Sequence, residues 1–314
     1  MSQASGSARP LREIIRPTTI IDAPRLSRKL GVNLSIATET FQLTGSFKLR
    51  AAYNVAARVP NRSIITASSG NFGQAMAFAC SLLGKSCTIV MPQSSAKVKI
   101  DAVREYGGEV DLIDVRQTTR AARVAELAAG HPEAYIASAY DDPLVIEGNS
   151  SLGEELTGIR PSYDIIVAPI GGGGLTSGIV TAVANAGQST RVIAAEPLLG
   201  NDAARSLRAG HIVSNESEPQ TVADGARTVS VGVHNWAVLQ RGLSAIVEVP
   251  DENIKEGLRQ LFSLANLKAE PTGALGIGAL LTQPEIFHGA SVCCVVSGGN
   301  VDPQVYQAIL TGGL

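Results

Sequence analysis

The sequence has no excess of charge of either sign, because 26 lysines and arginines stand against 28 aspartates and glutamates. The net charge of −2 argues against nucleic acid or an anionic membrane as the main partner, since both recruit basic surfaces. Aromatic residues make up only 4% of the chain, whereas glycine occurs 32 times. This composition indicates many tight turns between strands and helices.

Long apolar runs are also absent. No stretch reaches the roughly 20 apolar residues that a membrane helix needs, and residues 1–10 lack the apolar segment of a signal peptide. The cysteines have no metal-ligand spacing, and the histidines are too scattered to suggest a site. All the cysteines lie in apolar stretches and are expected to be buried thiols of a cytoplasmic protein. They are Cys80, Cys87, Cys293 and Cys294.

What the sequence does contain is a regular alternation. With 314 residues, 45% of them hydrophobic, the chain is long enough for two domains. Short apolar segments alternate with stretches of helical periodicity over residues 63–157, and a second such series covers residues 164–311. This alternation predicts βαβ units. We therefore expect an α/β fold with two open, parallel-type sheets flanked by helices.

One lysine, Lys48, directly follows the turn Gly45-Ser46-Phe47 and leads into an apolar segment. An amine that a tight turn delivers to the start of a helix is suited to forming a Schiff base. Partial burial would lower its pKa toward neutrality. A solvated lysine at the start of a helix is the alternative, and this stretch by itself does not separate the two.

Four consecutive glycines follow the apolar stretch 165–170, and a helical pattern begins after them. They are Gly171, Gly172, Gly173 and Gly174. The backbone N–H groups of such a loop, at the N-terminus of a helix, bind phosphate or another anion. An ordinary turn would not need four glycines, each of which costs about 1 kcal/mol of conformational entropy. A dinucleotide is the competing ligand, but the spacing is not Gly-x-Gly-x-x-Gly.

Two polar residues stand at the ends of apolar stretches. Ser297 ends the apolar strand 292–296, and ligands bind at the carboxyl edge of parallel sheets. A serine in a glycine-rich turn is the alternative for this position. Asn71 follows a Ser-Ser-Gly turn at the start of a helix, where capping the helix would be its ordinary role.

Glu196 and Asp202 follow a strand and lie six residues apart, with Gly200 between them. Two carboxylates and a free backbone carbonyl suit a hard divalent cation with oxygen ligands. Taken alone, the pair fits surface carboxylates better than a metal site, because short motifs match often by chance.

These stretches, in this order, resemble the pyridoxal-phosphate (PLP) enzymes of fold type II, the tryptophan-synthase-β type. They are most similar to the serine/threonine dehydratases and serine racemases, over about residues 26–301. The resemblance implies a small domain of residues 59–140 inserted into a large PLP-binding domain of residues 1–58 and 141–314. It also implies a homodimer that acts on a small amino-acid substrate.

The resemblance assigns roles in holding the cofactor. Lys48 would bind PLP as a Schiff base, the four glycines would hold its phosphate, and Ser297 would meet its pyridine nitrogen. The other implied cofactor contacts are Phe47, Asn71, Leu175, Gly225 and Glu270.

Further residues are implied in binding the substrate and a metal. The substrate carboxylate would bind the loop Ser68, Ser69, Gly70 and Asn71. Ser69 would also act as a second proton carrier beside Lys48, and Arg120 would serve the same pocket. Glu196, Gly200 and Asp202 match the family's Mg2+ or Mn2+ site.

The same resemblance implies an ammonia-lyase. The enzyme would eliminate water from a β-hydroxy amino acid such as L-serine or L-threonine and release a 2-oxo acid and ammonia. An amino-acid racemase is the main alternative, whereas a β-replacement enzyme or a non-catalytic PLP- or amino-acid-binding regulator is less favoured. Phe72 stands where the family usually has histidine, which removes a polar group beside the carboxylate loop and leaves the substrate open.

Overall fold

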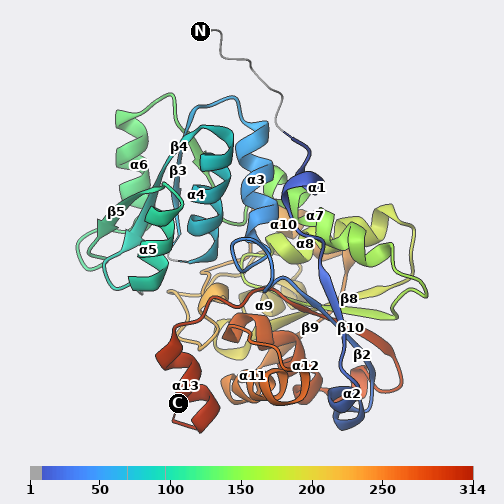
Figure 1. Cartoon of the computed structure of the whole chain (residues 1–314). Coiled ribbons are helices and arrows are strands. Elements are labelled where there is room, and N and C mark those ends of the chain that lie inside the picture. Colours follow the sequence, from blue (N-terminus) through green and yellow to red (C-terminus); the bar gives the residue numbers. More distant parts are fainter. Residues whose placement is uncertain (1–8, 69, 96, 314) are drawn as a thin grey trace.

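The computed structural model describes residues 9–68, 70–95 and 97–313. Its strands form two separate sheets, and helices flank each of them (Figure 1). This arrangement confirms the α/β class that the alternation of apolar and helical segments predicted.

The larger sheet has six strands in the order β1-β2-β10-β7-β8-β9. Their bounds are β1 (Thr19–Asp22), β2 (Asn33–Thr38), β7 (Ile165–Pro169), β8 (Arg191–Pro197), β9 (Leu243–Val249) and β10 (Ser291–Val296). All neighbours are parallel except β1 and β2. In the centre, Val292 of β10 pairs with Leu34 on one side and with Ile165 on the other. These central strands are apolar on both faces because helices cover both.

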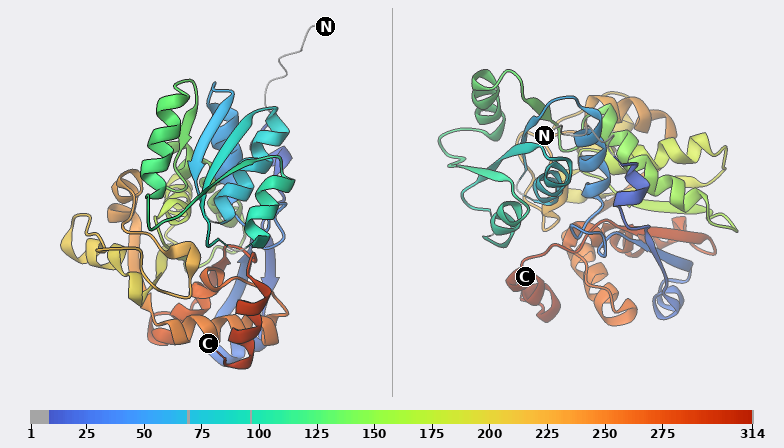
Figure 2. Two further views of the ribbon diagram at one scale, coloured as in Figure 1. Left: turned by 90° about the vertical axis from the view of Figure 1, so that its left-hand side faces the viewer. Right: turned by 45° about the horizontal axis from the view of Figure 1, so that its top comes forward.

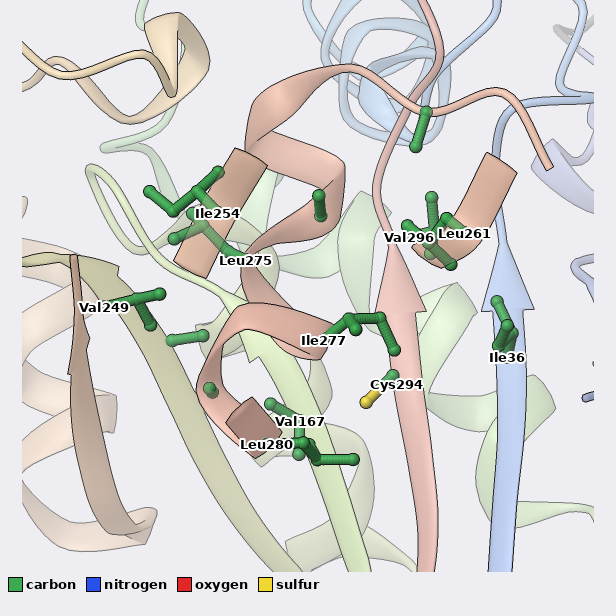
Figure 3. Packing of buried hydrophobic residues seen from close by; sticks show 14 of the residues in the cluster. Ile36, Val167, Val249, Ile254, Leu261, Leu275, Ile277, Leu280, Cys294 and Val296 are labelled. Atoms are coloured by element: carbon green, nitrogen blue, oxygen red, sulfur yellow. The ribbon is translucent and has the colours of Figure 1, made fainter. Parts of the chain in front are cut away.

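Two groups of helices cover the six-stranded sheet. One face packs against α2 (Pro24–Leu30), α11 (Asp251–Ala265), α12 (Leu275–Thr282) and α13 (Pro303–Thr311). Figure 3 shows part of this core, with Ile277 of α12 near Cys294 of β10. The other face packs against α7 (Pro143–Thr157), α8 (Gly174–Asn185) and α10 (Val233–Gly242).

The smaller sheet has four strands, all parallel, in the order β5-β4-β3-β6. They are β3 (Ser63–Ala67), β4 (Ser86–Pro92), β5 (Glu109–Ile113) and β6 (Tyr135–Ala137). The helices around it are α4 (Asn71–Leu83), α5 (Lys97–Glu105) and α6 (Arg120–Gly130). The two views of Figure 2 show this lobe beside the six-stranded one.

Helix α3 (Lys48–Arg58) joins the two lobes. Its apolar residues share a buried cluster with α4 and the four-stranded sheet, although α3 precedes the predicted domain boundary at residue 59. It also packs against α7 of the larger lobe. The domain limits at residues 59 and 140 stay a prediction.

The remaining elements are short. They are α1 (Leu11–Ile14), α9 (Asp202–Ala209) and the 3-10 turns η1 (Leu198–Gly200), η2 (Asp224–Ala226), η3 (Pro271–Ala274) and η4 (Pro284–Ile286). Strand β1 and helix α10 were not predicted from the sequence. Strand β1 is an exposed edge strand of four residues, and α10 carries a weak apolar stripe with Val233 exposed. Over the described ranges, no helix combines the length and the apolar character needed to cross a membrane.

Candidate active site

Lys48 is delivered to the carboxyl edge of the six-stranded sheet by the loop that precedes it. The N–H of Phe47 donates to the carbonyl of Ser297 at 3.0 Å, and the N–H of Gly299 donates to the carbonyl of Gly45 at 3.0 Å. Gly45 has φ +72°, and a Cβ there would lie 2.3 Å from the side-chain oxygen of Asn300. Only glycine fits this turn, so the local sequence fixes where Lys48 begins its helix.

The Lys48 amine lies in an apolar, buried setting. Its Nζ donates to the carbonyl of Ala139 at 2.8 Å and lies 5.1 Å and 5.7 Å from the ring centres of Phe47 and Phe72. Burial lowers the pKa of Lys48 to about 8, although the nearby carboxylate of Glu270 opposes the shift. A lysine that is partly neutral near physiological pH is a nucleophile and a base.

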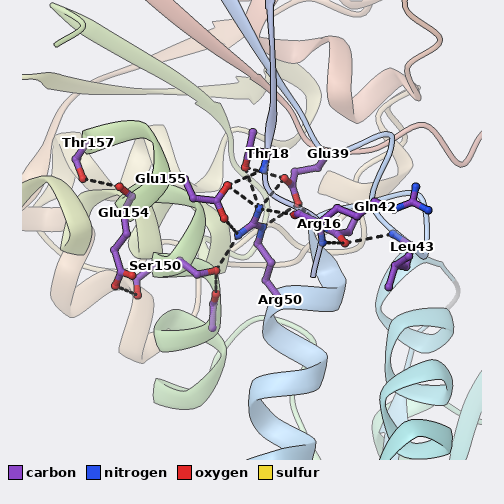
Figure 4. A network of polar contacts seen from close by, with 12 residues as sticks. Arg16, Thr18, Glu39, Gln42, Leu43, Arg50, Ser150, Glu154, Glu155 and Thr157 are labelled. Carbon is purple, nitrogen blue, oxygen red and sulfur yellow. Dashed lines mark hydrogen bonds and ion pairs between the residues drawn. The ribbon is translucent and has the colours of Figure 1, made fainter. Parts of the chain in front are cut away.

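A buried ion-pair network anchors the first turn of α3 (Figure 4). Arg50 is fully buried; its Nε donates to Glu39 at 2.9 Å and its Nη1 to Glu155 at 2.9 Å. Its Nη2 also donates to the hydroxyl of Thr18 at 2.9 Å. One cation thus ties the helix that carries Lys48 to the residue before β1, to the loop after β2 and to α7.

The four-glycine loop leads from β7 into α8 and faces the same space. Gly173 has φ +95° and caps α8, and a Cβ on Gly172 would lie 2.1 Å from the ring of Tyr140. The side-chain amide of Asn235 donates to the carbonyl of Gly172 at 2.7 Å, which orients the loop. Its position at a helix N-terminus suits an anion such as a phosphate.

These parts enclose a cavity of about 300 Å³ between the two lobes. Every predicted cofactor-binding residue lines it: Phe47, Lys48, Asn71, Gly171, Gly172, Gly173, Gly174, Leu175, Gly225, Glu270 and Ser297. So do Ser68, Gly70 and Arg120 from the predicted substrate-binding set. Ser69 lies outside the described residues.

Polar groups of other elements also line the cavity. The side-chain amide of Asn71 donates to Glu270 at 2.8 Å and accepts from Asn300 at 2.9 Å. Burial raises the pKa of Glu270 to about 7, helped by the charge of Asp224. The hydroxyl of Ser297 is buried and has no hydrogen-bond partner among the described residues. A buried hydroxyl without a partner indicates a site for a ligand group.

Two ion pairs cross the mouth of the cavity from one lobe to the other. Lys99 of α5 donates to Asp224 of η2 at 2.6 Å, and Arg120 of α6 pairs with Glu218. In both pairs, the cation comes from the smaller lobe and is more buried than the anion.

Comparisons with known proteins agree with this site. The sequence matches the family model "Pyridoxal-phosphate dependent enzyme" over residues 11–298. It is 34% identical to an L-threo-3-hydroxyaspartate ammonia-lyase of Pseudomonas sp, over 98% of this chain and 97% of that protein. It is 33% identical to the serine racemase of Homo sapiens, over 93% of this chain and 88% of that protein. The solved threonine deaminase of T.th. superposes with a TM-score of 0.87 at 35% identity, covering 93% of this chain and 95% of that one.

The chain belongs to the pyridoxal-phosphate dependent enzymes. The structural match confirms the predicted fold type II, and family membership makes PLP the cofactor. The residues present fit this group, because the glycine loop, the buried Lys48 amine and the unpartnered Ser297 hydroxyl line one cavity. A phosphate, an aldehyde and a ring nitrogen are the groups that such a set can receive.

Three residues of this pyridoxal-phosphate dependent enzyme were missed as site residues in the sequence: Lys99, Tyr140 and Asn235. Asn235 belongs to α10, a helix that the sequence pattern did not reveal. Tyr140 was noted only within a segment that resembles the family. Lys99 gave no signal, because nothing in its neighbourhood distinguishes it from the solvated Lys97 two residues earlier.

The predicted metal residues lie outside the cavity, at the end of β8. Glu196 accepts from the N–H groups of Ala203 and Ala204 at 2.8 Å each, and Asp202 accepts from the N–H of Val231 at 2.7 Å. Burial and the charge of Asp202 raise the pKa of Glu196 to about 8, and burial raises the pKa of Asp202 to about 7. Both carboxylates are buried, so the surface alternative is wrong.

Proposed function

We propose that this enzyme is an ammonia-lyase that removes water from a β-hydroxy amino acid. Loss of the α-proton and the β-hydroxyl releases one water, and hydrolysis of the resulting enamine consumes one, so the products are a 2-oxo acid and ammonia. The observation that carries the proposal is the Lys48 amine in the cavity that fits PLP, in a chain 34% identical to an ammonia-lyase over 98% of its length. When bound, PLP supplies the electron sink that makes the α-proton acidic.

Each group of the cavity has a place in this proposal. The Nζ of Lys48 takes the α-proton, and burial favours its neutral, basic form. The glycine loop would hold the phosphate, Asn71 would meet the ring oxygen, and the neutral hydroxyl of Ser297 would meet the ring nitrogen. A neutral partner at that nitrogen favours elimination and proton exchange over transamination.

The choice among β-hydroxy amino acids is open to test. Relatives of this chain are named after L-threo-3-hydroxyaspartate and after threonine. Two arginines, Arg120 and Arg227, line the cavity. Their positive charge supports a substrate with an acidic side chain, such as L-threo-3-hydroxyaspartate, in addition to L-serine and L-threonine. Measuring the 2-oxo acid and ammonia released from each of these three substrates tests the function. Failure to release ammonia from any β-hydroxy amino acid would contradict it.

Racemisation is the second candidate, because the serine racemases of several mammals match this chain as closely as the ammonia-lyases do. It requires a proton carrier on each face of the α-carbon, and Lys48 serves only one. Ser69 is the second carrier that we propose. The Ser69→Ala variant should keep most elimination from L-serine and lose any conversion of L-serine to D-serine, as measured by chiral chromatography. Equal loss of both reactions would instead assign Ser69 to substrate binding.

A divalent cation at Glu196 and Asp202 is also part of the proposal. Two buried carboxylates whose pKa values are both raised would be stabilised by a cation between them, and the carbonyl of Gly200 would be a third oxygen ligand. Among the described residues, no set of three or more His, Cys, Asp or Glu side chains could hold a metal ion. The cation would therefore complete its shell with backbone carbonyl and water oxygens, as Mg2+ and Mn2+ do.

The homodimer and the cytoplasmic location stay proposals that rest on the sequence. Light scattering of the purified holoenzyme and fractionation of cells that express it would test them. A monomer in solution, or the protein in an extracellular fraction, would contradict the respective proposal.

A further inference from the structure

A segment in neither a helix nor a strand, residues 228–232, lies against the four-glycine loop. The N–H of Gly232 donates to the carbonyl of Gly172 at 3.0 Å. A Cβ on Gly173 would lie 3.1 Å from the side chain of Val231, so the segment and the loop pack closely. Backbone groups outside regular structure need partners from elsewhere in the chain. The position of the four-glycine loop therefore depends on what holds this segment.

Asn215 holds the segment together with the buried carboxylate of Asp202. The N–H of Asn215 donates to the carbonyl of Val229 at 2.8 Å, and its side-chain amide donates to the carbonyl of Thr228 at 3.3 Å. The same Nδ2 donates to Asp202 at 3.1 Å. Asp202 also accepts from the N–H of Val231 at 2.7 Å. These four hydrogen bonds attach the segment at Thr228, Val229 and Val231.

The side-chain amide of Asn215 has one orientation that satisfies its partners. Its Oδ1 accepts from Nη2 of Arg205, whose Nε donates to Asn201 at 3.0 Å. An arginine has donors only, so the amide oxygen must face Arg205. The Nδ2 then faces the carboxylate of Asp202 and the carbonyl of Thr228, a residue that lines the cavity. One amide thus links a buried charge to the wall of the cavity.

We propose that Asn215 is a positioning residue for cofactor binding. By tying the segment 228–232 to Asp202, it keeps the four-glycine loop in place for the phosphate of PLP. The proposal rests on the proposed role of that loop in holding the phosphate, and it is independent of the substrate and of the reaction. Asn215 acts through the segment rather than on the cofactor.

Loss of the amide should affect the phosphate and spare the rest of the cofactor. Asn215→Ala keeps the backbone hydrogen bond to Val229 and removes the side-chain bonds. We expect the Kd of PLP to rise about 10-fold, as for the loss of one hydrogen bond to a charged group. Pyridoxal lacks the phosphate, so its Kd should stay nearly unchanged. If Asn215 served only the general stability of the fold, both Kd values would rise together.

The experiment titrates the cofactor-free, full-length protein with PLP and, in parallel, with pyridoxal. The change in absorption of the bound compound reports each Kd without substrate or turnover. Arg205→Met leaves the amide of Asn215 free to rotate, so it should raise the Kd of PLP severalfold and spare that of pyridoxal. Asn253→Ala is the matched control, because the half-buried Asn253 of α11 donates to Thr282 at 3.0 Å. It should change neither Kd.

The same titrations in excess chelator separate the hydrogen bonds from a cation at Asp202. The ratio of the PLP Kd values of Asn215→Ala and the wild type should persist in chelator. A ratio that falls to one there would assign the effect to the cation and overturn the proposal. An unchanged Kd of PLP in Asn215→Ala, or an equal rise for PLP and pyridoxal, would overturn it as well.

Melting temperatures show whether Asn215→Ala stays folded, and if it does not, Arg205→Met decides. If the wild type binds PLP and pyridoxal equally well, the proposed phosphate role of the four-glycine loop fails, and the role of Asn215 fails with it. If PLP binds as expected but no β-hydroxy amino acid releases ammonia, the proposed reaction fails while the Kd values still judge Asn215.

Discussion

The first turn of helix α3 and the mouth of the cavity hold their charges in different ways. Beside the first turn of α3, Arg50 and Glu39 are 0% and 1% exposed and form a pair that water does not reach. At the mouth, Glu218 and Asp224 are 49% and 41% exposed. Breaking a buried pair leaves an uncompensated charge, whereas an exposed anion is solvated by water at little cost. The buried pair beside α3 is therefore expected to contribute far more to stability than the pairs at the mouth.

The two lysines of the cavity also hold their charges in different ways. Lys48 Nζ donates to a backbone carbonyl and lies near two aromatic rings, and burial lowers its pKa to about 8 despite the charge of Glu270. Lys99 meets a carboxylate at 2.6 Å, and its pKa is raised despite burial. The same side chain serves as a base in one place and as a permanent cation in the other.

The largest effect should follow from removing the Lys48 amine. In our proposal this amine binds PLP and moves the α-proton, so in Lys48→Ala we expect elimination at least about 10⁴-fold below the wild type. Mass spectrometry after borohydride reduction should find no PLP attached to the protein, while the melting temperature stays close to that of the wild type. A borohydride-reducible adduct in Lys48→Ala would contradict the assignment. Lys97→Ala is the control and should retain the adduct.

Removing the buried cation Arg50 should cost the most stability. Arg50→Met leaves Glu39 and Glu155 without their buried partner, and we expect a loss of about 3–5 kcal/mol in the free energy of unfolding. Urea unfolding measures it. Arg58→Met is the matched control, because Arg58 and Glu147 form an exposed pair whose loss should cost about 1 kcal/mol or less. Equal losses in the two variants would remove the distinction between buried and exposed pairs.

The buried acid pair offers a third case, in which like charges face each other. The pKa values of Glu196 and Asp202 are raised to about 8 and about 7, so the folded state binds more protons than the unfolded state between about pH 4 and 8. Without a cation, the stability that protonation provides should be lost as the pH rises through this window.

A cation should reverse that loss. At a hundredfold excess over its Kd, Mg2+ or Mn2+ should stabilise the fold by about 2.7 kcal/mol, and chelation should lower the melting temperature at pH 8 more than at pH 5. The paired variant Glu196→Gln, Asp202→Asn should lose this sensitivity to chelator. A melting curve that chelator leaves unchanged at both pH values would argue against a metal.

The smallest effect tests the electrostatics around Lys48. The carboxylate of Glu270 raises the pKa of Lys48, so Glu270→Gln should lower it further. The rate of PLP uptake by the cofactor-free protein should then reach half its maximum at a pH below 8. We expect this midpoint to shift by less than about one pH unit. Glu218→Gln is the control, since Glu218 lines the same cavity but pairs with Arg120. An upward shift of this midpoint in Glu270→Gln would contradict the prediction.

Much of the fold and of the site could be predicted from the sequence, because their signals are local. Hydrophobic periodicity predicts the apolar strands. Glycines predict the turn before Lys48 and the four-glycine loop, because close approach of the backbone requires a residue without a side chain. Strand β1 and helix α10 were missed, because both are largely exposed and carry no strong apolar pattern. Asn235 was not predicted as a site residue because α10 was not predicted, although its side chain donates to the glycine loop and orients it.

What the sequence by itself determined is the order of most elements, the position of Lys48 behind its turn and the four-glycine turn at the start of α8. Only the tertiary structure decided which lysine loses its proton. Lys48 is buried against Ala139, 91 residues away, and Lys99 meets Asp224, 125 residues away. A pKa depends on desolvation and on charges within a few ångströms, and these distances exist only once the two lobes have packed together.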